Sequence, residues 1–161
     1  MDGPHRVPGI EIRELGEGEE IAAADLVMRV FAAYVGHEYS ARGVEEFARY
    51  ADASALRERL DGGQCIALAA VRGDALIGVI EFRGTDHLSL LFVDDRFHRR
   101  GIARALLSEM IEKLAAAGTA VSSVEVNSSR DAIPAYRRLG FEVSGPERTV
   151  DGITFTPMRR R

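Results

Sequence analysis

A glycine flanked by arginines, between an apolar strand and a long helix, is the strongest chemical signal in the sequence. The run His98-Arg99-Arg100-Gly101 precedes a helix that begins Ile102-Ala103-Arg104. The first N–H groups of a helix have no backbone partner, and the helix dipole adds partial positive charge at that end. Gly101 lets a ligand approach the backbone closely, while the arginines add full positive charge. Together these residues predict a site for a phosphate-bearing ligand.

Two common phosphate-binding loops do not match this segment. The Walker sequence G-x-x-x-x-G-K-S/T occurs nowhere in the chain. A dinucleotide fingerprint needs three glycines and an acidic residue at the end of the next strand. Glycine-containing turns also connect strands to helices without binding a ligand. The segment alone therefore leaves open an ordinary connection whose arginines lie in solvent.

A resemblance to a known family favours a phosphate-binding loop over an ordinary connection between strand and helix. The residues His98-Arg99-Arg100-Gly101-Ile102-Ala103 resemble the acyl-CoA pyrophosphate motif of the GNAT superfamily of N-acetyltransferases, Q/R-x-x-G-x-G/A, with His98 in place of Gln or Arg. Downstream, the strand Val124-Glu125-Val126-Asn127 leads to a segment that contains Tyr136 and ends at Leu139-Gly140-Phe141. This order resembles the family's second block, A-x-x-x-Y followed by L-G-F. The motifs cover about half of the chain.

The resemblance implies an acetyl-CoA-dependent N-acetyltransferase that transfers an acetyl group to a primary amine on a small molecule or peptide. The amine would attack the thioester directly in a ternary complex. A backbone N–H of the strand Leu91-Phe92-Val93 would point at the thioester carbonyl, and Asn127 would hydrogen-bond the coenzyme arm. The residues implied in coenzyme binding are Leu91, Phe92, Val93, His98, Arg99, Arg100, Gly101, Ile102, Ala103, Arg104 and Asn127.

Tyr136 is the implied general acid, because the family's second block places a tyrosine there to protonate the departing coenzyme thiolate. A helix that begins near Asp131 tolerates Pro134 in its first turn and brings Ala132 and Tyr136 onto one face. The alternative is a structural ring packed under Phe141, since aromatic residues at helical spacing usually belong to a core.

The general base is open between two residues. His87 lies where many histone-type members of the family have a Glu, and an imidazole with an unperturbed pKa of about 6.5 suits proton abstraction at neutral pH. An exposed histidine at a strand edge is the alternative. Glu81, on the preceding strand, is the second candidate and would act through water. Its alternating strand nevertheless favours a solvent-facing side chain.

Glu38 and Tyr39 follow the first predicted helix, where the family gathers residues that bind the amine. A polar loop at this position can also simply connect two helices. No metal is expected, because the chain has one cysteine and no histidine pair at ligand spacing. The four histidines are His5, His37, His87 and His98.

Periodicity places these residues on specific elements. Strands are predicted over residues 10–15, 65–72, 75–83, 87–93 and 124–127, and a hairpin at the end of the chain. Helices are predicted over residues 19–35, 44–51 and 53–60, then from residue 103 to a cap at Gly118, and from near Asp131. In the strand 87–93, alternation puts His87, Ser89, Leu91 and Val93 on one face.

This element order predicts a single domain over residues 1–161 with an α/β (α+β) fold. A mixed, largely antiparallel central sheet of about six or seven strands, flanked by helices on both faces, is the natural packing. The resemblance implies the same GNAT-like architecture. An exposed edge strand at the C-terminal hairpin would allow a homodimer.

Composition limits the partners and the compartment. A net charge of −4 and a pI of about 5.6 argue against a nucleic-acid or membrane-surface binder, and against an acetyltransferase that acts on charged transfer RNA. The chain start lacks the apolar core of a signal peptide, and the single Cys65, in an apolar run, is expected to be buried and reduced. A cytoplasmic protein is therefore expected. A non-catalytic acyl-CoA sensor also stays open, because the strand before the loop lacks the family's Glu.

Overall fold

The computed structural model describes residues 6–161; residues 1–5, which include the chain start and His5, lie outside this range. Its strands are β1 (Glu11–Glu14), β2 (Cys65–Arg72), β3 (Ala75–Arg83), β4 (His87–Val93), β5 (Val124–Ser128), β6 (Glu142–Val143), β7 (Arg148–Val150) and β8 (Ile153–Arg160). Its helices are α1 (Glu20–Tyr34), α2 (Ala41–Ala51), α3 (Ala53–Asp61), α4 (Ile102–Ala116) and α5 (Ile133–Arg138), with 3-10 turns η1 (Gly36–Glu38) and η2 (Asp95–Phe97). No helix within residues 6–161 has both the length and the apolar character that a membrane crossing requires.

Within residues 6–161, eight strands form one open sheet in the order β1-β2-β3-β4-β5-β8-β6, with β7 paired to β8. The pairings in this sheet are antiparallel except that of β4 with β5, which α4 connects as a parallel crossover. The expected mixed, largely antiparallel sheet is confirmed. It has one strand more than the expected six or seven, because β6 has only two residues, too few to leave a periodic signal in the sequence.

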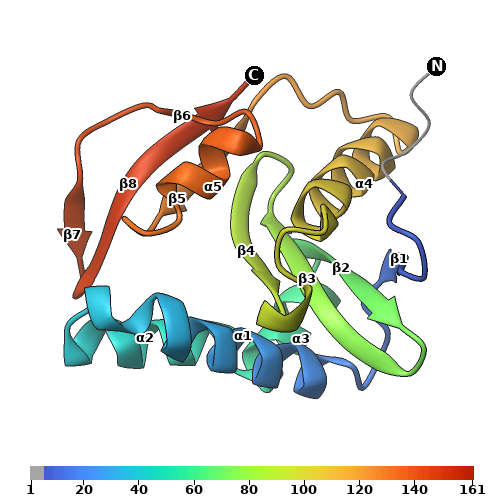
Figure 1. Ribbon diagram of the computed structural model, residues 1–161, viewed down its shortest axis with the longest axis horizontal. Helices are drawn as coiled ribbons and strands as arrows, with labels where there is room; N and C mark the ends of the chain where they lie inside the picture. The colour runs from blue at the N-terminus through green and yellow to red at the C-terminus, as the bar shows by residue number, and fades with distance from the viewer. Residues whose placement is uncertain (1–5) are drawn as a thin grey trace.

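Two helical layers cover the two faces of the sheet (Figure 1). Helices α1, α2 and α3 lie against one face, and α4 and α5 lie against the other. The core on the α4 side includes Phe82 and Leu106, and the core on the α1 side includes Leu26 and Val79. Helices on both faces were expected, and this arrangement confirms them.

Most expected bounds agree with the structure, and the differences have local causes. Strands β2, β3 and β4 begin and end where the pattern predicts. Helix α2 begins at Ala41 rather than Val44, because the Ser40 side chain caps it by accepting a hydrogen bond from the Gly43 N–H at 3.2 Å. Helix α5 is short and begins after a turn over residues 130–132.

A β-bulge interrupts β4 near its start. Glu81 of β3 pairs with Leu90, and the following residue, Phe82, pairs with Leu88. Ser89 is therefore the extra residue of the bulge. Bulges of this kind redirect side chains, and this one lies at the start of the strand that carries four of the candidate site residues: His87, Leu91, Phe92 and Val93.

The bulge changes which residues share a face. His87 and Ser89 lie on the α1 side of the sheet, where the Ser89 hydroxyl contacts the Glu81 carboxylate at 2.5 Å. Leu91 and Val93 pack in the α4-side core instead. The prediction that these four residues of β4 share one face is therefore wrong, because the extra residue breaks the alternation of a regular strand.

Strands β4 and β5 are paired only at their beginnings. His87 pairs with Glu125 and Leu88 pairs with Val126. Beyond these pairs, β4 keeps β3 as its neighbour and β5 keeps β8. In the described part of the chain, residues 90–93 have no strand partner on the β5 side. The sheet is thus split at the point where the chain continues into η2 and α4.

Candidate active site

A buried aspartate fixes the turn between β4 and α4. The Asp94 carboxylate accepts hydrogen bonds from the Arg96 backbone N–H at 3.0 Å, from the Arg96 guanidinium at 2.9 and 3.1 Å, and from Arg29 at 3.3 Å. The hydrogen bonds from Arg96 hold the pKa of Asp94 well below its usual range. An Asp two residues before its N–H partner is a recognisable turn signal, so the sequence carried this information.

The loop after this turn presents the N-terminus of α4. Gly101 is its N-cap residue with a φ of 81°, and Arg99 has a φ of 62°, so both lie in the left-handed region. The Ala105 N–H donates to the Gly101 carbonyl at 3.0 Å. The N–H groups of residues 102–104 therefore precede the helical hydrogen-bond ladder. A Cβ placed on Gly101 would meet nothing within 4 Å, so the space at this turn is open.

Three side chains of the predicted phosphate loop are occupied within the protein. His98 Nε2 lies 2.7 Å from the Val93 carbonyl oxygen, and Arg104 donates to the Arg138 carbonyl at 2.5 Å. Ile102 is buried in the α4-side core. These residues hold the loop and the helix start in place, so Ile102 offers a ligand its backbone N–H rather than its side chain.

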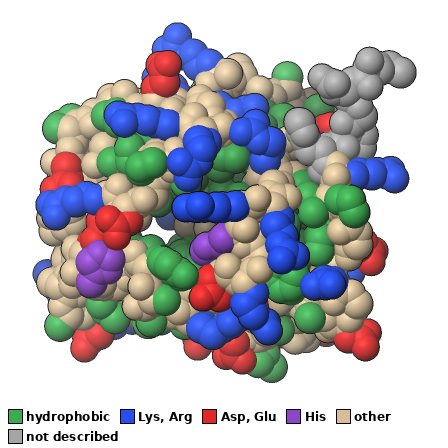
Figure 2. All heavy atoms as spheres, in the orientation of Figure 1, with side chains coloured by type: hydrophobic (Ala, Val, Ile, Leu, Met, Phe, Trp, Pro, Cys, Tyr) green, Lys and Arg blue, Asp and Glu red, His purple; other side chains and the backbone are tan. Residues whose placement is uncertain are grey.

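Arg99 and Arg100 supply charge that the protein does not neutralise. Within residues 6–161 neither guanidinium forms an ion pair, and Arg100 lies over the Phe97 ring at 5.2 Å from its centroid. Figure 2 shows Lys and Arg side chains gathered around a hollow near the centre of this face. Open space, leading N–H groups and unpaired cations together fit the phosphates of an acyl coenzyme.

A glycine in β3 sets the position of the helix start. A Cβ on Gly78 would lie 3.3 Å from Leu106 Cδ1 and from Ala70 Cβ, and 3.5 Å from Ile102 Cγ2. The first turns of α4 therefore pack directly on the β3 backbone. The sequence offered no specific signal for this contact, because a glycine within an apolar strand can equally mark a bulge.

A pocket of about 550 Å³ lies on the α1 side of the sheet, beside the start of β4. Its walls come from α2, α3, β3, β4, β5, the hairpin of β7 and β8, and the segment between η1 and α2. The residues that line it are Tyr39, Glu46, Phe47, Arg49, Tyr50, Ala55, Arg59, Arg83, His87, Leu88, Ser89, Asn127, Val150, Asp151, Ile153 and Phe155. It brings together His87, Asn127 and Tyr39 from the sequence-derived candidates. Glu38 and Tyr136 are not among its lining residues.

Glu81 lies directly behind this pocket and is fully buried, with 0 % exposure. Its carboxylate accepts hydrogen bonds from the Tyr50 hydroxyl at 2.5 Å, from Ser89 at 2.5 Å, and from the Arg59 guanidinium at 2.9 and 3.1 Å. The expectation that Glu81 faces solvent is therefore wrong. Helices α2 and α3 cover this side of β3, so alternation along the strand does not separate interior from exterior positions.

The groups around Glu81 hold their protons tightly. Burial, assisted by the hydrogen bond to Glu81, raises the pKa of Tyr50 to about 12. The Arg59 guanidinium lies 3.7 Å from the centroid of the Tyr50 ring. Cys65 is buried as expected, and burial raises the pKa of its thiol to about 12, which makes it a poor nucleophile.

His87 is half-buried on the pocket wall, across the strand pair from Arg83. Burial and then the positive charge of Arg83 lower the pKa of His87 below its usual 6.5, while Glu125 and Asp86 oppose this effect. The imidazole is therefore neutral at physiological pH and can accept a proton. The exposed strand-edge position considered as an alternative does not describe this half-buried residue.

Tyr136 packs as a structural aromatic ring while keeping its proton. Its ring lies edge-on to Phe141, with centroids 5.4 Å apart. The side chain is half-buried against the α4-side core. Burial, and then the neighbouring Tyr39, raise the pKa of its hydroxyl above the usual value. The hydroxyl is therefore protonated at neutral pH, as an acid must be before it acts.

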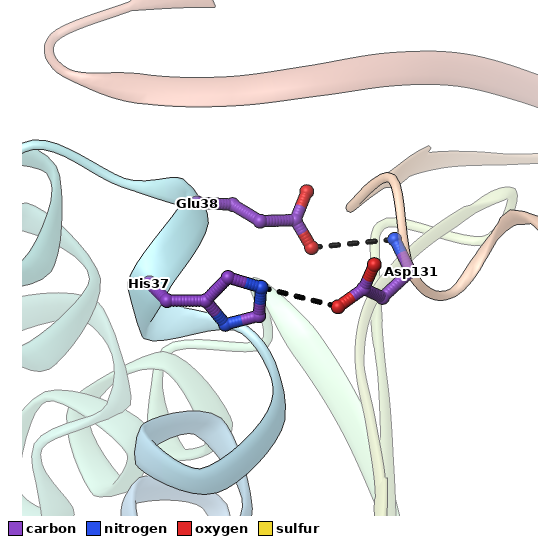
Figure 3. A group of neighbouring side chains, drawn as sticks. All are labelled: His37, Glu38 and Asp131. Carbon is purple, nitrogen blue, oxygen red and sulfur yellow. Dashed lines mark hydrogen bonds and ion pairs between the residues drawn. The ribbon is translucent and has the colours of Figure 1, made fainter.

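Glu38 joins two segments that are remote in the sequence (Figure 3). Its carboxylate accepts hydrogen bonds from the Arg130 N–H at 2.7 Å and from the Asp131 N–H at 3.2 Å. His37 Nε2 lies 3.1 Å from an Asp131 carboxylate oxygen. These three side chains, His37, Glu38 and Asp131, lie close enough to hold a metal ion, but both Glu38 oxygens already accept from the backbone. We assign them to holding η1 against the turn before α5.

The turn between β7 and β8 docks on the start of α2. The Ser40 N–H donates to the Gly152 carbonyl at 3.2 Å, and Arg42 pairs with Asp151 at 2.8 Å. A Cβ on Gly43 would lie 2.1 Å from the Gly152 oxygen, so only glycine fits this approach. This contact closes one side of the pocket, and sequence reasoning missed it because the two segments lie far apart in the chain.

The fold and the two neighbouring sites define a class of protein. The family model for the acetyltransferase (GNAT) domain matches residues 35–161. The chain therefore belongs to the GNAT acetyltransferase family and is an N-acetyltransferase.

Individual relatives agree with this assignment. The chain is 27% identical over 140 residues to the uncharacterized N-acetyltransferase YafP of Escherichia coli, across 86% of this chain and 85% of YafP. A GCN5-related N-acetyltransferase from Rhodopseudomonas palustris shares the fold with a TM-score of 0.77 and 18% identity, over 98% of this chain and 99% of that one. PaiA N-acetyltransferase from Thermoplasma acidophilum, solved in complex with coenzyme A, also has a TM-score of 0.77, with 20% identity over 94% and 98%.

Proposed function

We propose that this protein transfers an acetyl group from acetyl-CoA to a primary amine by direct attack in a ternary complex. The observation that carries the proposal is the start of α4. Its leading N–H groups, the open turn at Gly101 and two unpaired arginines lie at the end of a strand whose other edge is unpaired. Such a site favours a diphosphate joined to an extended arm.

Coenzyme binding is assigned mainly to the backbone. The N–H groups of residues 102–104 and the side chains of Arg99 and Arg100 bind phosphate oxygens. The unpaired edge of β4 at Leu91, Phe92 and Val93 hydrogen-bonds the arm, and Asn127 of β5 faces it. When bound, the coenzyme supplies the activated acetyl group. His98 and Arg104 hold the loop through the contacts to Val93 and Arg138 described above.

Proton transfer is assigned to residues on both sides of the split between β4 and β5. Neutral His87 accepts the proton that the attacking amine loses. Tyr136 donates its proton to the departing thiolate. Glu81 is a positioning residue in this scheme, because its carboxylate oxygens are occupied by Arg59, Ser89 and Tyr50 and hold those side chains in place. Tyr39 contacts the acceptor, and Glu38 supports that wall of the pocket.

We further infer a single-domain cytoplasmic enzyme over residues 1–161 that works without metal or nucleic acid. The acidic net charge and the buried single thiol support this view, and in the His37, Glu38 and Asp131 cluster both Glu38 oxygens already accept from backbone N–H groups. A homodimer through the C-terminal hairpin stays a prediction.

A matched pair of glycine variants tests the coenzyme site. Gly101→Asp places a carboxylate against the phosphates and should weaken acetyl-CoA binding by roughly 10- to 100-fold in calorimetry. Gly118→Asp is the control, because Gly118 has a similar left-handed φ of 92° and equally open space at the other end of α4. Equal affinity in both folded variants would contradict the assignment.

Coenzyme thiol release across a panel of amines then tests transfer. Tyr136→Phe should lower kcat by about 100-fold or more while coenzyme affinity is kept, since general acid catalysis contributes factors of this order. Coenzyme binding without turnover of any amine, and no effect of Tyr136→Phe, would favour a non-catalytic coenzyme sensor instead.

A further inference from the structure

We propose that the acceptor is an α-amino acid with an apolar or aromatic side chain, whose carboxylate is bound by Arg83. The inference deepens the proposed function and rests on it, because the pocket beside His87 is taken as the acceptor site.

The charge balance of the pocket supports an anionic group on the acceptor. Four of its charged lining residues have partners of opposite charge: Glu46 and Arg49 pair with each other at 2.8 Å, Asp151 pairs with Arg42 at 2.8 Å, and Arg59 pairs with Glu81 at 2.9 Å. Arg83 differs from them. Within residues 6–161 its guanidinium has neither an ion pair nor a side-chain hydrogen bond. The pocket therefore keeps one uncompensated positive charge.

The register of the sheet puts that charge beside the residue assigned as the base. Arg83 and His87 are directly paired across β3 and β4. Side chains of such a pair share one face and have Cβ atoms roughly 5 Å apart. A carboxylate held by Arg83 therefore brings an amine on the adjacent carbon next to the imidazole. An acceptor whose amine and carboxylate are far apart would not satisfy both residues.

Apolar and aromatic side chains also line the pocket. Phe47 stacks on Phe31 at a centroid distance of 4.0 Å and is held rigidly. Phe155 and Val150 also line the pocket, and Val150 is 52% exposed. An exposed valine in a pocket with rigid aromatic rings suits an apolar side chain of the acceptor.

The same charge balance disfavours polycationic acceptors. A polyamine or an aminocyclitol sugar would need free carboxylates, and both lining carboxylates, Glu46 and Asp151, already face arginines. An added cation would also meet Arg83, since like charges repel in a partly enclosed site.

Binding and turnover with matched probes test the proposal. Phenylalanine, phenylalaninamide and phenylalaninol share the amine and the ring but differ in the carboxylate. In the protein–CoA complex, calorimetry should show phenylalanine binding roughly 10- to 100-fold more tightly than phenylalaninol, as expected for an ion pair to a charged group. Arg83→Gln should remove most of this difference. The probes also differ in the pKa of the amine. This difference cancels when the ratio of phenylalanine affinity to phenylalaninol affinity is compared between wild type and variant.

The matched control is Arg49→Gln, which removes a charge from the same pocket whose partner is Glu46. It should leave the phenylalanine-to-phenylalaninol ratio within about threefold of wild type, because an exposed ion pair contributes little. An equal preference for both probes in the wild type, tighter binding of polyamines, or loss of the ratio in Arg49→Gln rather than Arg83→Gln would overturn the inference. Carboxylate-dependent binding without acetyl transfer would contradict only the proposed function.

Discussion

At the scale of single residues, the main lesson comes from Glu81. It was the weaker of two candidate bases, and alternation favoured a position in solvent. In the structure it is fully buried and accepts from Tyr50, Arg59 and Ser89. A strand covered by helices on both faces does not alternate between core and solvent. A charged residue within an apolar strand is then better interpreted as one half of a buried pair.

Removing one residue of the buried ion pair between Glu81 and Arg59 should destabilise the protein. Glu81→Gln leaves the Arg59 guanidinium buried without its counter-charge and should lower the free energy of unfolding by about 3–5 kcal/mol in denaturant titrations. The double variant Glu81→Leu, Arg59→Met should recover much of that loss, because an apolar pair of similar size avoids the desolvation cost. A Glu81→Gln protein as stable as the wild type would contradict the buried pair.

The pH dependence of turnover should report the environment of His87. The imidazole must be neutral to act as a base, and its pKa lies below 6.5. We therefore expect kcat/KM to fall as the pH decreases through that lowered pKa. Arg83→Gln removes a nearby cation and should move this limb to higher pH, whereas Glu125→Gln removes an anion and should move it to lower pH. Shifts in the same direction for both variants would exclude His87 as the titrating group.

At the scale of elements, the sequence pattern best predicted the order of the helices and strands and the bounds of the central strands. The alternating and apolar runs at β2, β3 and β4 correctly predicted their ends, and the two motifs placed α4 and α5. The bulge at Ser89 escaped prediction, because one inserted residue changes register without changing composition. The walls of the pocket were not predicted from the sequence either. They depend on contacts such as Gly43 with Gly152, between segments far apart in the sequence.

The contact between α2 and the β7–β8 turn is itself testable. Gly43→Ala should favour the helix by propensity alone, yet its methyl group would lie 2.1 Å from the Gly152 oxygen. We expect a loss of about 1–3 kcal/mol of stability and a raised KM for the acceptor, with the coenzyme affinity unchanged. Gly36→Ala is the matched control, since its Cβ would make ordinary contacts with Phe31 at 3.4 Å or more. An unchanged KM in Gly43→Ala would show that this turn does not shape the pocket.

At the scale of the whole molecule, two cores share one sheet. Strands β3 and β4 contribute side chains to both, so neither core can be lost without exposing the other. The proposed coenzyme site uses the end of β4 and the start of α4, and the proposed acceptor site uses the opposite face of the same strands. Both sites therefore depend on one continuous structure.

We accordingly expect one cooperative unfolding transition in calorimetry for the full chain. Acetyl-CoA should raise the midpoint temperature of this transition. At a concentration 100 times the dissociation constant, it should add about 2.7 kcal/mol to the free energy of unfolding. At the same concentration, 10- to 100-fold weaker binding in Gly101→Asp should reduce this increase to about 0.4–1.4 kcal/mol, and Gly118→Asp should keep it in full. Two separate transitions would show that residues 1–161 do not form a single domain.

The split between β4 and β5 has a consequence for solubility. A strand edge without a partner normally invites another polypeptide to add to the sheet, which leads to aggregation. Here that edge lies inside the sheet, with β5 beyond it and helical layers above and below, rather than at the rim of the molecule. This position suits an extended coenzyme arm better than a strand of a second protein, whose approach β5 and the helical layers would obstruct. Under the proposed function, the same backbone groups would bind the coenzyme arm without promoting association between copies of the enzyme.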